Sequence, residues 1–291
     1  MTVNEPLVLS PLADPVVGAI FCNVESAGLA AESLIRAVLA SDDAILTGKI
    51  ISVTPQYIYN APRGRGCRID VVVITDANER VIFEVQVYAD AHIMTRDLFS
   101  AAHVFTRAAA RGDTAAEMAA KLPKVICINI LGYNIRSDNN DVVQPFKILY
   151  TKPPQRTAIP HFSGYNVQLP RIAEMKPDFL NPLYCWGYTL HTAHANKKSV
   201  QEVIEMTPEL QMYAETDNGY FQFCKQYDRA AANPTTMDEY RNWVLYVMRE
   251  EGMRIAAVEA GREEERAKWQ QITNDKDAEI ARLRALLGDN V

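Results

Sequence analysis

The chain has 291 residues, of which 48% are hydrophobic and 23% are charged, a composition typical of a globular protein and not of a disordered one. Its net charge of −6 argues against a protein that coats nucleic acid through a basic surface, because neutralising phosphates requires Lys and Arg. The charge does not exclude a nuclease, since bound metal ions supply positive charge locally.

The cysteines and the amino-terminal segment exclude further classes. The five cysteines are an odd number without a C-x-x-C pair, which argues against a disulfide framework or a zinc knuckle. Residues 1–10 have neither a basic region nor a long apolar run, so no signal peptide is predicted. No apolar run approaches the roughly 20 residues that span a bilayer. We therefore expect a protein of a prokaryotic cytoplasm without a membrane partner.

The first half of the chain alternates between helical and extended patterns. Apolar residues at helical spacing predict helices, and alternating or β-branched runs predict strands. In chain order we expect a helix over 25–40, strands over 50–59, 70–74 and 81–88, a helix over 92–110 and a strand over 124–131. This αβββαβ order predicts an α/β (α+β) fold in which helices flank a mixed sheet.

The second half begins with two more predicted strands and is otherwise helical. The strands are expected over 142–150 and 165–169. Helical patterns then dominate, over 183–192, 199–204, 209–214, 219–232 and 236–258. The sequence therefore predicts a helical carboxy-terminal region.

The last stretch, 259–291, is rich in Glu, Arg and Lys. Ile280, Leu283 and Leu287 have the spacing of one coiled-coil heptad, and Trp269 with Ile272 gives a hint of another. The polar residues between them, 273–277, interrupt this apolar seam. Two interpretations stay open: a short coiled coil that forms a homo-oligomer, and a solvated helix.

Two acidic residues oppose each other in the predicted hairpin of 70–74 and 81–88. A turn centred on Ala77 places Asp70 directly opposite Glu84, with Gln86 further along the same face. Opposed carboxylates repel, and burial makes each more costly, so a divalent cation between them would remove both penalties. This predicts a metal site. The alternatives are a strand-start role for Asp70 and a water-facing edge position for Glu84.

Asp70, the hairpin and Glu84-Val85-Gln86 resemble the PD-(D/E)xK nuclease superfamily. The closest resemblance is to the PD-(D/E)xK nuclease family transposases, or recombination-promoting nucleases, in which Gln usually stands where the superfamily has Lys. The similarity continues through Arg96 and through the predicted strand 124–131. It implies a restriction-endonuclease-like core. We accordingly expect an amino-terminal tail over 1–13, a nuclease core over 14–175, a helical region over 176–258 and a charged helix over 259–291.

The resemblance also implies roles in a metal site. Asp70 and Glu84 would bind Mg²⁺, with Mn²⁺ as a substitute, and the Val85 carbonyl would reach the same ion. Gln86 would contact the attacking water or the phosphate, since an amide cannot act as a general base. The superfamily often adds an acid from the first helix, for which Glu32 is the candidate; an ordinary surface glutamate is the alternative.

Arginines near the acidic pair are candidates for contact with nucleic acid. Arg96 could bind a phosphate in bidentate fashion, and its alternative is a surface salt bridge to Asp97 or Asp90. A basic loop precedes Asp70 and could hold the DNA backbone or could simply be solvated; its arginines are Arg63, Arg65 and Arg68.

By resemblance we expect a metal-dependent DNA endonuclease, a hydrolase acting on phosphodiester bonds, linked to mobile elements or recombination. Two alternatives stay open: an RNA nuclease that uses the same carboxylates, and a non-catalytic DNA-binding or scaffold protein with a degenerate site.

Overall fold

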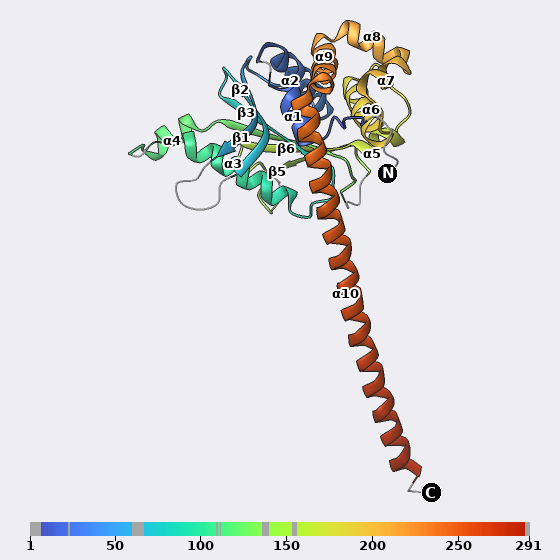
Figure 1. The fold of residues 1–291 in the computed structure, drawn as a ribbon. Helices are drawn as coiled ribbons and strands as arrows, with labels where there is room; N and C mark the ends of the chain where they lie inside the picture. Colours follow the sequence, from blue (N-terminus) through green and yellow to red (C-terminus); the bar gives the residue numbers. More distant parts are fainter. Residues whose placement is uncertain are drawn as a thin grey trace. The chain divides into compact units, whose positions relative to one another are not determined.

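A single mixed β-sheet forms the centre of the fold in the computed structural model, which describes residues 7–22, 24–59, 67–108, 110, 112–135, 140–152 and 156–288 (Figure 1). The strands described are β1 (Ile50–Tyr59), β2 (Cys67–Thr75), β3 (Glu79–Gln86), β4 (Lys124–Leu131), β5 (Val143–Lys147) and β6 (Phe162–Gln168). Each predicted strand is present, and β1 and β4 have the predicted bounds.

The strand order in the sheet is β1-β2-β3-β4-β6-β5. The first three strands are antiparallel neighbours, β3–β4 and β4–β6 are parallel pairs, and β5 is antiparallel to β6. The expectation of a mixed sheet is therefore confirmed. β4 lies in the middle, and all but its first residue are buried, as is usual for a strand covered on both faces.

Ten α-helices are found among the described residues, together with a 3₁₀ turn at Ala40–Asp42. They are α1 (Asp14–Ile20), α2 (Val24–Leu39), α3 (Ile93–Ala108), α4 (Ala115–Lys121), α5 (Leu169–Glu174), α6 (Pro182–Ala195), α7 (Val200–Glu205), α8 (Pro208–Thr216), α9 (Asn218–Ala232) and α10 (Pro234–Gly288). The short helices α1, α4 and α5 were not predicted from the sequence, whereas α7, which is as short as α5, was predicted over 199–204.

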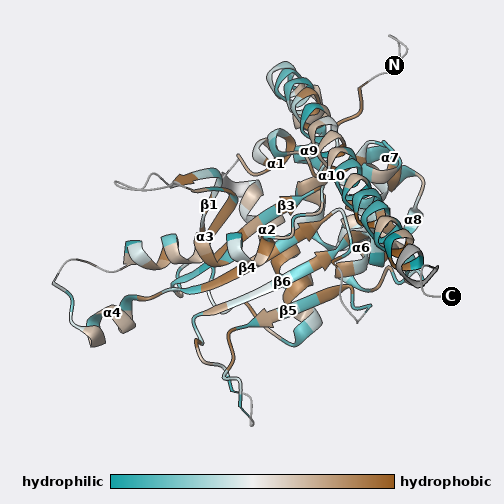
Figure 2. Ribbon diagram, turned by 90° about the horizontal axis from the view of Figure 1, so that it is seen from below, coloured by the Kyte–Doolittle hydropathy of each residue, from teal (hydrophilic) through white to brown (hydrophobic). Residues whose placement is uncertain are grey.

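Helices cover both faces of the sheet. Ile82 of β3 belongs to a buried cluster with Ala101 of α3, whereas its neighbour Phe83 stacks on Phe21 at the end of α1 with ring centroids 6.3 Å apart. Adjacent strand residues point to opposite faces, so α3 and α1 lie on opposite sides. Figure 2 shows hydrophobic residues concentrated on the strands between these layers.

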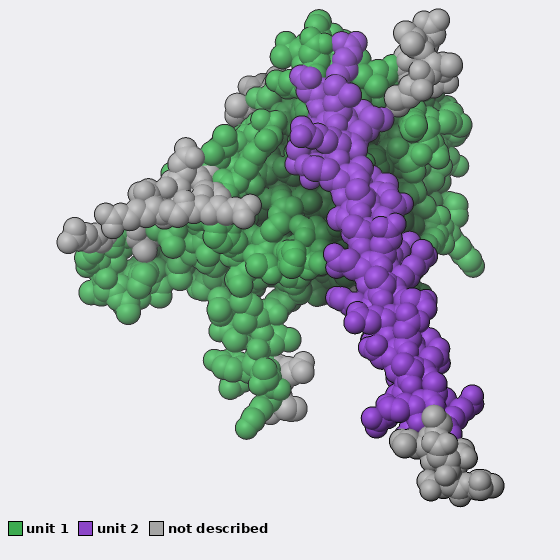
Figure 3. Space-filling view, turned by 60° about the horizontal axis from the view of Figure 1, so that its bottom comes forward, with its two compact units in different colours: residues 1–240 green, residues 241–291 purple. Residues whose placement is uncertain are grey.

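The chain divides into two compact units, Met1–Tyr240 and Arg241–Val291 (Figure 3). This differs from the expected boundary at residue 175, because α6 and α9 complete the core around α2. Trp186 of α6 donates from Nε1 to Ser33 Oγ at 3.0 Å. Gly219 of α9 lies so close to α2 that a Cβ there would come within 2.3 Å of the Leu29 carbonyl oxygen. The helical region therefore folds as part of unit 1.

Helix α10 runs unbroken from Pro234 to Gly288. The polar residues 273–277 do not end it, since Thr273 Oγ1 donates to the Trp269 carbonyl at 2.9 Å and Gln270 Nε2 donates to Asn274 Oδ1 at 3.1 Å. Helical structure thus continues across the expected division at 258/259. None of the helices in the described ranges has the length and apolar character needed to cross a bilayer.

Candidate active site

The predicted hairpin of β2 and β3 has the predicted register. Val71 pairs with Phe83 and Ile74 with Arg80. The same register, extended one residue beyond the last observed pair, places Asp70 opposite Glu84. The turn contains Asn78 in the left-handed conformation at φ 58°, which Asn tolerates better than most residues. The local sequence therefore brings the two acids together at the end of the hairpin.

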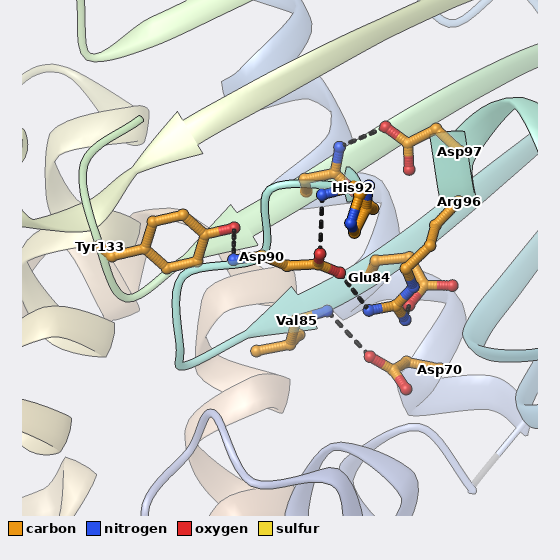
Figure 4. A network of polar contacts seen from close by, with 9 residues as sticks. Asp70, Glu84, Val85, Asp90, His92, Arg96, Asp97 and Tyr133 are labelled. Carbon is orange, nitrogen blue, oxygen red and sulfur yellow. Dashed lines mark hydrogen bonds and ion pairs between the residues drawn. The ribbon is translucent and has the colours of Figure 1, made fainter. Parts of the chain in front are cut away.

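Asp70 is tied to the backbone of the neighbouring strand. Its Oδ2 accepts a hydrogen bond from the Val85 N–H at 2.8 Å (Figure 4). Burial, followed by the nearby Asp14 carboxylate, raises the pKa of Asp70 to about 6. The Val85 N–H and the cations Arg96 and Arg68 act in the opposite direction. Asp70 is therefore held in place but is short of neutralising charge.

Glu84 is buried more deeply, with 4% of its surface exposed. Burial and then the Asp70 carboxylate raise its pKa to about 9, although the Arg96 guanidinium partly offsets this rise. Arg96 Nη2 donates to Glu84 Oε2 at 3.1 Å. One arginine does not compensate for two neighbouring acids, so the metal-free site favours retaining a proton on the pair.

A loop between β3 and α3 directs Arg96 at Glu84. Arg96 Nη1 donates to Asp90 Oδ2 at 3.3 Å, and Asp90 Oδ1 accepts the His92 N–H at 2.8 Å. The Asp90 N–H in turn donates to Tyr133 Oη at 3.2 Å. The expected alternative for Arg96, an ion pair with Asp90, is thus present, together with the pair to Glu84 that was not expected (Figure 4).

A buried polar network continues from Glu84 across the sheet. Asn129 of β4 is in register with Glu84 on one side and with Asn166 of β6 on the other. Its Nδ2 donates to Asp97 Oδ2 at 2.7 Å and to Asn166 Oδ1 at 2.8 Å. Burial raises the pKa of Asp97, which is 1% exposed, to about 6. Asp97 thereby anchors α3, one residue after Arg96, to the centre of the sheet.

This network was missed in the sequence. The signal was an asparagine in the otherwise apolar strand Lys124–Leu131, a position that is 0% exposed and so requires hydrogen-bond partners. Asp97 was considered only as a partner for Arg96. Neither Asp97 Oδ1 nor Asn129 Oδ1 meets a donor from the described residues.

The additional acid near the site comes from α1. Asp14 is the first residue of α1 and Pro15 is the second, a common helix start that the sequence interpretation overlooked. Its charge raises the pKa of both Asp70 and Glu84. Glu32, the predicted acid, instead accepts hydrogen bonds from Arg36 at 2.7 and 2.9 Å on the surface of α2.

Of the remaining predicted site residues, the structure describes Gln86 and Arg68. Gln86 lies two residues beyond Glu84 and so on the same face, is partly exposed, and has no side-chain hydrogen bond to the described part of the chain. Arg68 is exposed on β2 and near enough to lower the pKa of Asp70. Arg63 and Arg65 lie outside the described residues.

The donor set of this site is small. Among the residues that the structure describes, no group of three or more His, Cys, Asp or Glu converges as a metal cage. Two carboxylates are nevertheless sufficient for Mg²⁺, which commonly takes one or two carboxylates and fills its other positions with water and phosphate oxygens. The unbalanced negative charge of Asp70 and Glu84 suits such a cation.

Comparison with known proteins gives one match. The family model of the PD-(D/E)XK nuclease family transposases matches residues 20–243. No curated protein and no solved structure matches the chain. The matched range includes the whole sheet and the hairpin with Asp70, Glu84 and Gln86, and it ends near the start of unit 2.

Proposed function

We propose that this chain, which belongs to the PD-(D/E)XK nuclease family transposases, is a divalent-metal-dependent endonuclease that hydrolyses DNA in processes linked to mobile elements or recombination. The observation that supports this most is the acidic pair. Asp70 and Glu84 are brought together by the hairpin. The Asp70 carboxylate raises the pKa of Glu84, and the Asp14 carboxylate raises the pKa of both. A structural role alone would not require two poorly compensated carboxylates side by side.

The proposed metal ligands are the carboxylates of Asp70 and Glu84 and the carbonyl of Val85. The Val85 N–H already holds Asp70 Oδ2, so the backbone of β3 fixes one ligand while presenting another. Mg²⁺ or Mn²⁺ bound there would polarise the phosphate and lower the pKa of a bound water. Asp14 is our candidate for the additional acid, in place of Glu32, because its charge raises the pKa of both Asp70 and Glu84, whereas Asp97 acts on Glu84 and not on Asp70.

Two further side chains are suited to the phosphate and the water. The Gln86 amide can orient a water molecule by donating or accepting a hydrogen bond, although it cannot act as a base. Arg96 holds Glu84 in the metal-free protein, and a cation on Glu84 would free its guanidinium for a bidentate phosphate contact. The basic residues Arg63, Arg65 and Arg68 would contact the DNA backbone without sequence preference.

Plasmid cleavage by the purified protein tests this function. We expect nicking with Mg²⁺ or Mn²⁺, no nicking with EDTA, and none in Asp70→Asn or Glu84→Gln. Glu209→Gln is the matched control, because it makes the same chemical change on the exposed surface of α8. Cleavage that persists in EDTA or in both site variants would contradict the proposal.

Two companion measurements separate the alternatives. Matched single- and double-stranded RNA substrates should be cut more slowly than DNA; the reverse would assign the site to an RNA nuclease. Calorimetric titration with Mg²⁺ or Mn²⁺ should give a binding heat that Asp70→Ala abolishes. A protein with a degenerate site would show no such heat.

A further inference from the structure

Helix α10 carries a seam of regularly spaced residues in unit 2. In the heptad frame that places Trp269 at position a and Ile272 at position d, the seam residues are Val258, Arg262, Glu265, Trp269, Ile272, Lys276, Glu279 and Leu283. All eight are exposed, and the apolar four expose between 43% and 60% of their surface. Figure 2 shows hydrophilic and hydrophobic residues following one another along this helix.

The continuity of α10 allows one frame to run from Val258 to Leu283. Ile280 and Leu287, which the sequence analysis grouped with Leu283 in one heptad, occupy e positions in this frame and lie outside its core positions. The sequence suggested two short apolar heptads separated by the polar residues 273–277, but the helix passes through that segment without a break. Four charged residues then fall at core positions of the same frame, namely Arg262, Glu265, Lys276 and Glu279. A coiled coil tolerates charges at such positions only where the partner helix compensates them.

Parallel pairing with a second copy would not compensate them. In a parallel, in-register pair each residue faces its own copy. Arg262 would then face Arg262 and Glu265 would face Glu265, and the same holds for Lys276 and Glu279. Every charged layer of the seam would contain two like charges, and such juxtapositions are strongly unfavourable.

Antiparallel pairing compensates all of them. In this arrangement an a residue faces a d residue of the partner. With the two-fold axis between Gln270 and Gln271, charged residues meet opposite charges and apolar residues meet apolar ones. The facing pairs are Val258 with Leu283, Arg262 with Glu279, Glu265 with Lys276, and Trp269 with Ile272, and the symmetry repeats each pair once.

The match is specific to this register. If one helix slides by a heptad in either direction, Trp269 faces Glu265 or Glu279 instead of Ile272. The same shifts place Lys276 against Val258 or Ile272, so apolar layers become mixed and the charges lose their partners. Lys268 and Asp275 lie beside the seam at g positions. The g positions of two antiparallel helices face each other, so these opposite charges would attract across the pair.

We propose that residues 258–283 of α10 form an antiparallel coiled coil with the same segment of a second copy of this chain. The partner is another copy because the charge pattern is complementary to itself when reversed. The assembly would contain two copies of the acidic pair. If the proposed nuclease function holds, two phosphodiester bonds could be cut in one encounter; the pairing itself does not depend on that function.

The molar mass of the full-length protein by sedimentation velocity tests the pairing. We expect a dimer for the unaltered chain. Glu265→Lys places like charges in two layers and should raise the dimer dissociation constant by about tenfold or more. Glu264→Lys is the matched control, because it makes the same change one residue away at position c, outside the seam. It should leave the dimer intact.

Restoring the charges tests the orientation. The double variant Glu265→Lys with Lys276→Glu returns opposite charges to both layers only if the helices are antiparallel, and we expect it to dimerise. In parallel pairing it would have like charges in the same layers. The proposal is overturned if the unaltered chain is monomeric across the micromolar range, if Glu264→Lys disrupts the dimer as much as Glu265→Lys, or if the double variant stays monomeric.

Folding is checked independently in these variants. The substituted side chains are exposed in the chain described here, so the thermal unfolding of unit 1 should not change. Mass is measured without substrate or metal. A failure of the pairing is therefore distinguishable from a failure of the nuclease function.

Discussion

The hairpin of unit 1 and the helix of unit 2 both carry charges that the chain compensates only in part, but their surroundings differ. Arg96 pairs with one of the two hairpin acids, and Arg282 pairs with Glu279 of the seam. Glu84 is 4% exposed and lies beside Asp70, so its pKa rises to about 9. The charges of the α10 seam lie in water, where they cost little as long as the helix is alone. A buried pair of acids therefore needs a proton, an arginine or a metal ion to offset its charge, whereas an exposed charge pattern affects only which partner helix can pair with it.

Removing either buried acid should have the largest effect. Asp70→Asn or Glu84→Gln should lower cleavage by more than about 100-fold, since even an outer-shell partner of a metal can be worth about that much. The variants remove charge without much change in size, so folding should persist. Cleavage rates on supercoiled plasmid, with circular dichroism as the folding control, measure this. A loss of less than tenfold would contradict a direct role in metal binding.

Replacing Arg96, which forms an ion pair with Glu84, should have an intermediate effect on cleavage. Arg96→Ala removes the proposed phosphate contact and should lower cleavage by about 10- to 100-fold. Metal binding should persist, because the cation and the guanidinium compete for Glu84. Arg36→Ala, on the exposed surface of α2, is the matched control. Loss of metal binding in Arg96→Ala would mean that Arg96 maintains the folded geometry of the site, and the proposed phosphate contact would not be supported.

The pH dependence of metal binding should report the proton on Glu84. Its pKa of about 9 lies above its ordinary value of 4.5, so between about pH 6 and 9 a cation must displace one proton. The apparent affinity for Mg²⁺ should then rise about tenfold per pH unit across that window. Calorimetry in buffers of different ionisation enthalpy measures the proton released, and an affinity independent of pH would refute the expectation.

The same pKa has a consequence for the metal-free fold. Because the folded value is raised, the folded state holds a proton that the unfolded chain has lost, and stability should fall as pH rises towards 9. Glu84→Gln should flatten this dependence. Urea unfolding of the EDTA-treated protein at several pH values measures it.

Breaking the buried network should destabilise unit 1 moderately. Asn129→Leu removes both hydrogen bonds of Nδ2 and leaves Asp97 without its donor, which should cost about 1–3 kcal/mol of unfolding free energy. Urea unfolding below pH 5, where Asp97 is protonated, should show a smaller loss. An equal loss at all pH values would mean that packing and not charge dominates.

The smallest effect is expected at Glu32. Its ion pair with Arg36 is exposed and spans one helical turn, so Glu32→Gln should cost about 0.2–0.5 kcal/mol. Asp14→Asn should lower cleavage more than Glu32→Gln does. If Glu32→Gln lowers cleavage more than Asp14→Asn does, Glu32 is the better candidate for the additional acid.

Local sequence was sufficient for the strands, for the longer helices and for the acidic pair. The Val- and Ile-rich runs with a turn between them predict β2 and β3, and the period of a strand then decides which residues oppose each other. The strand 124–131 was predicted with its observed bounds because its apolar run is interrupted only at Asn129 and ends sharply.

Tertiary structure decided which distant residues join these local features. That Asp14 reaches the acidic pair, that Asp97 meets Asn129, and that Arg96 holds Glu84 depends on how helices pack on the sheet. Packing also decided that the helices after residue 175 belong to unit 1. Periodicity and turn chemistry act over a few residues and are written in the sequence, whereas burial and its effect on charge exist only once separate segments have come together.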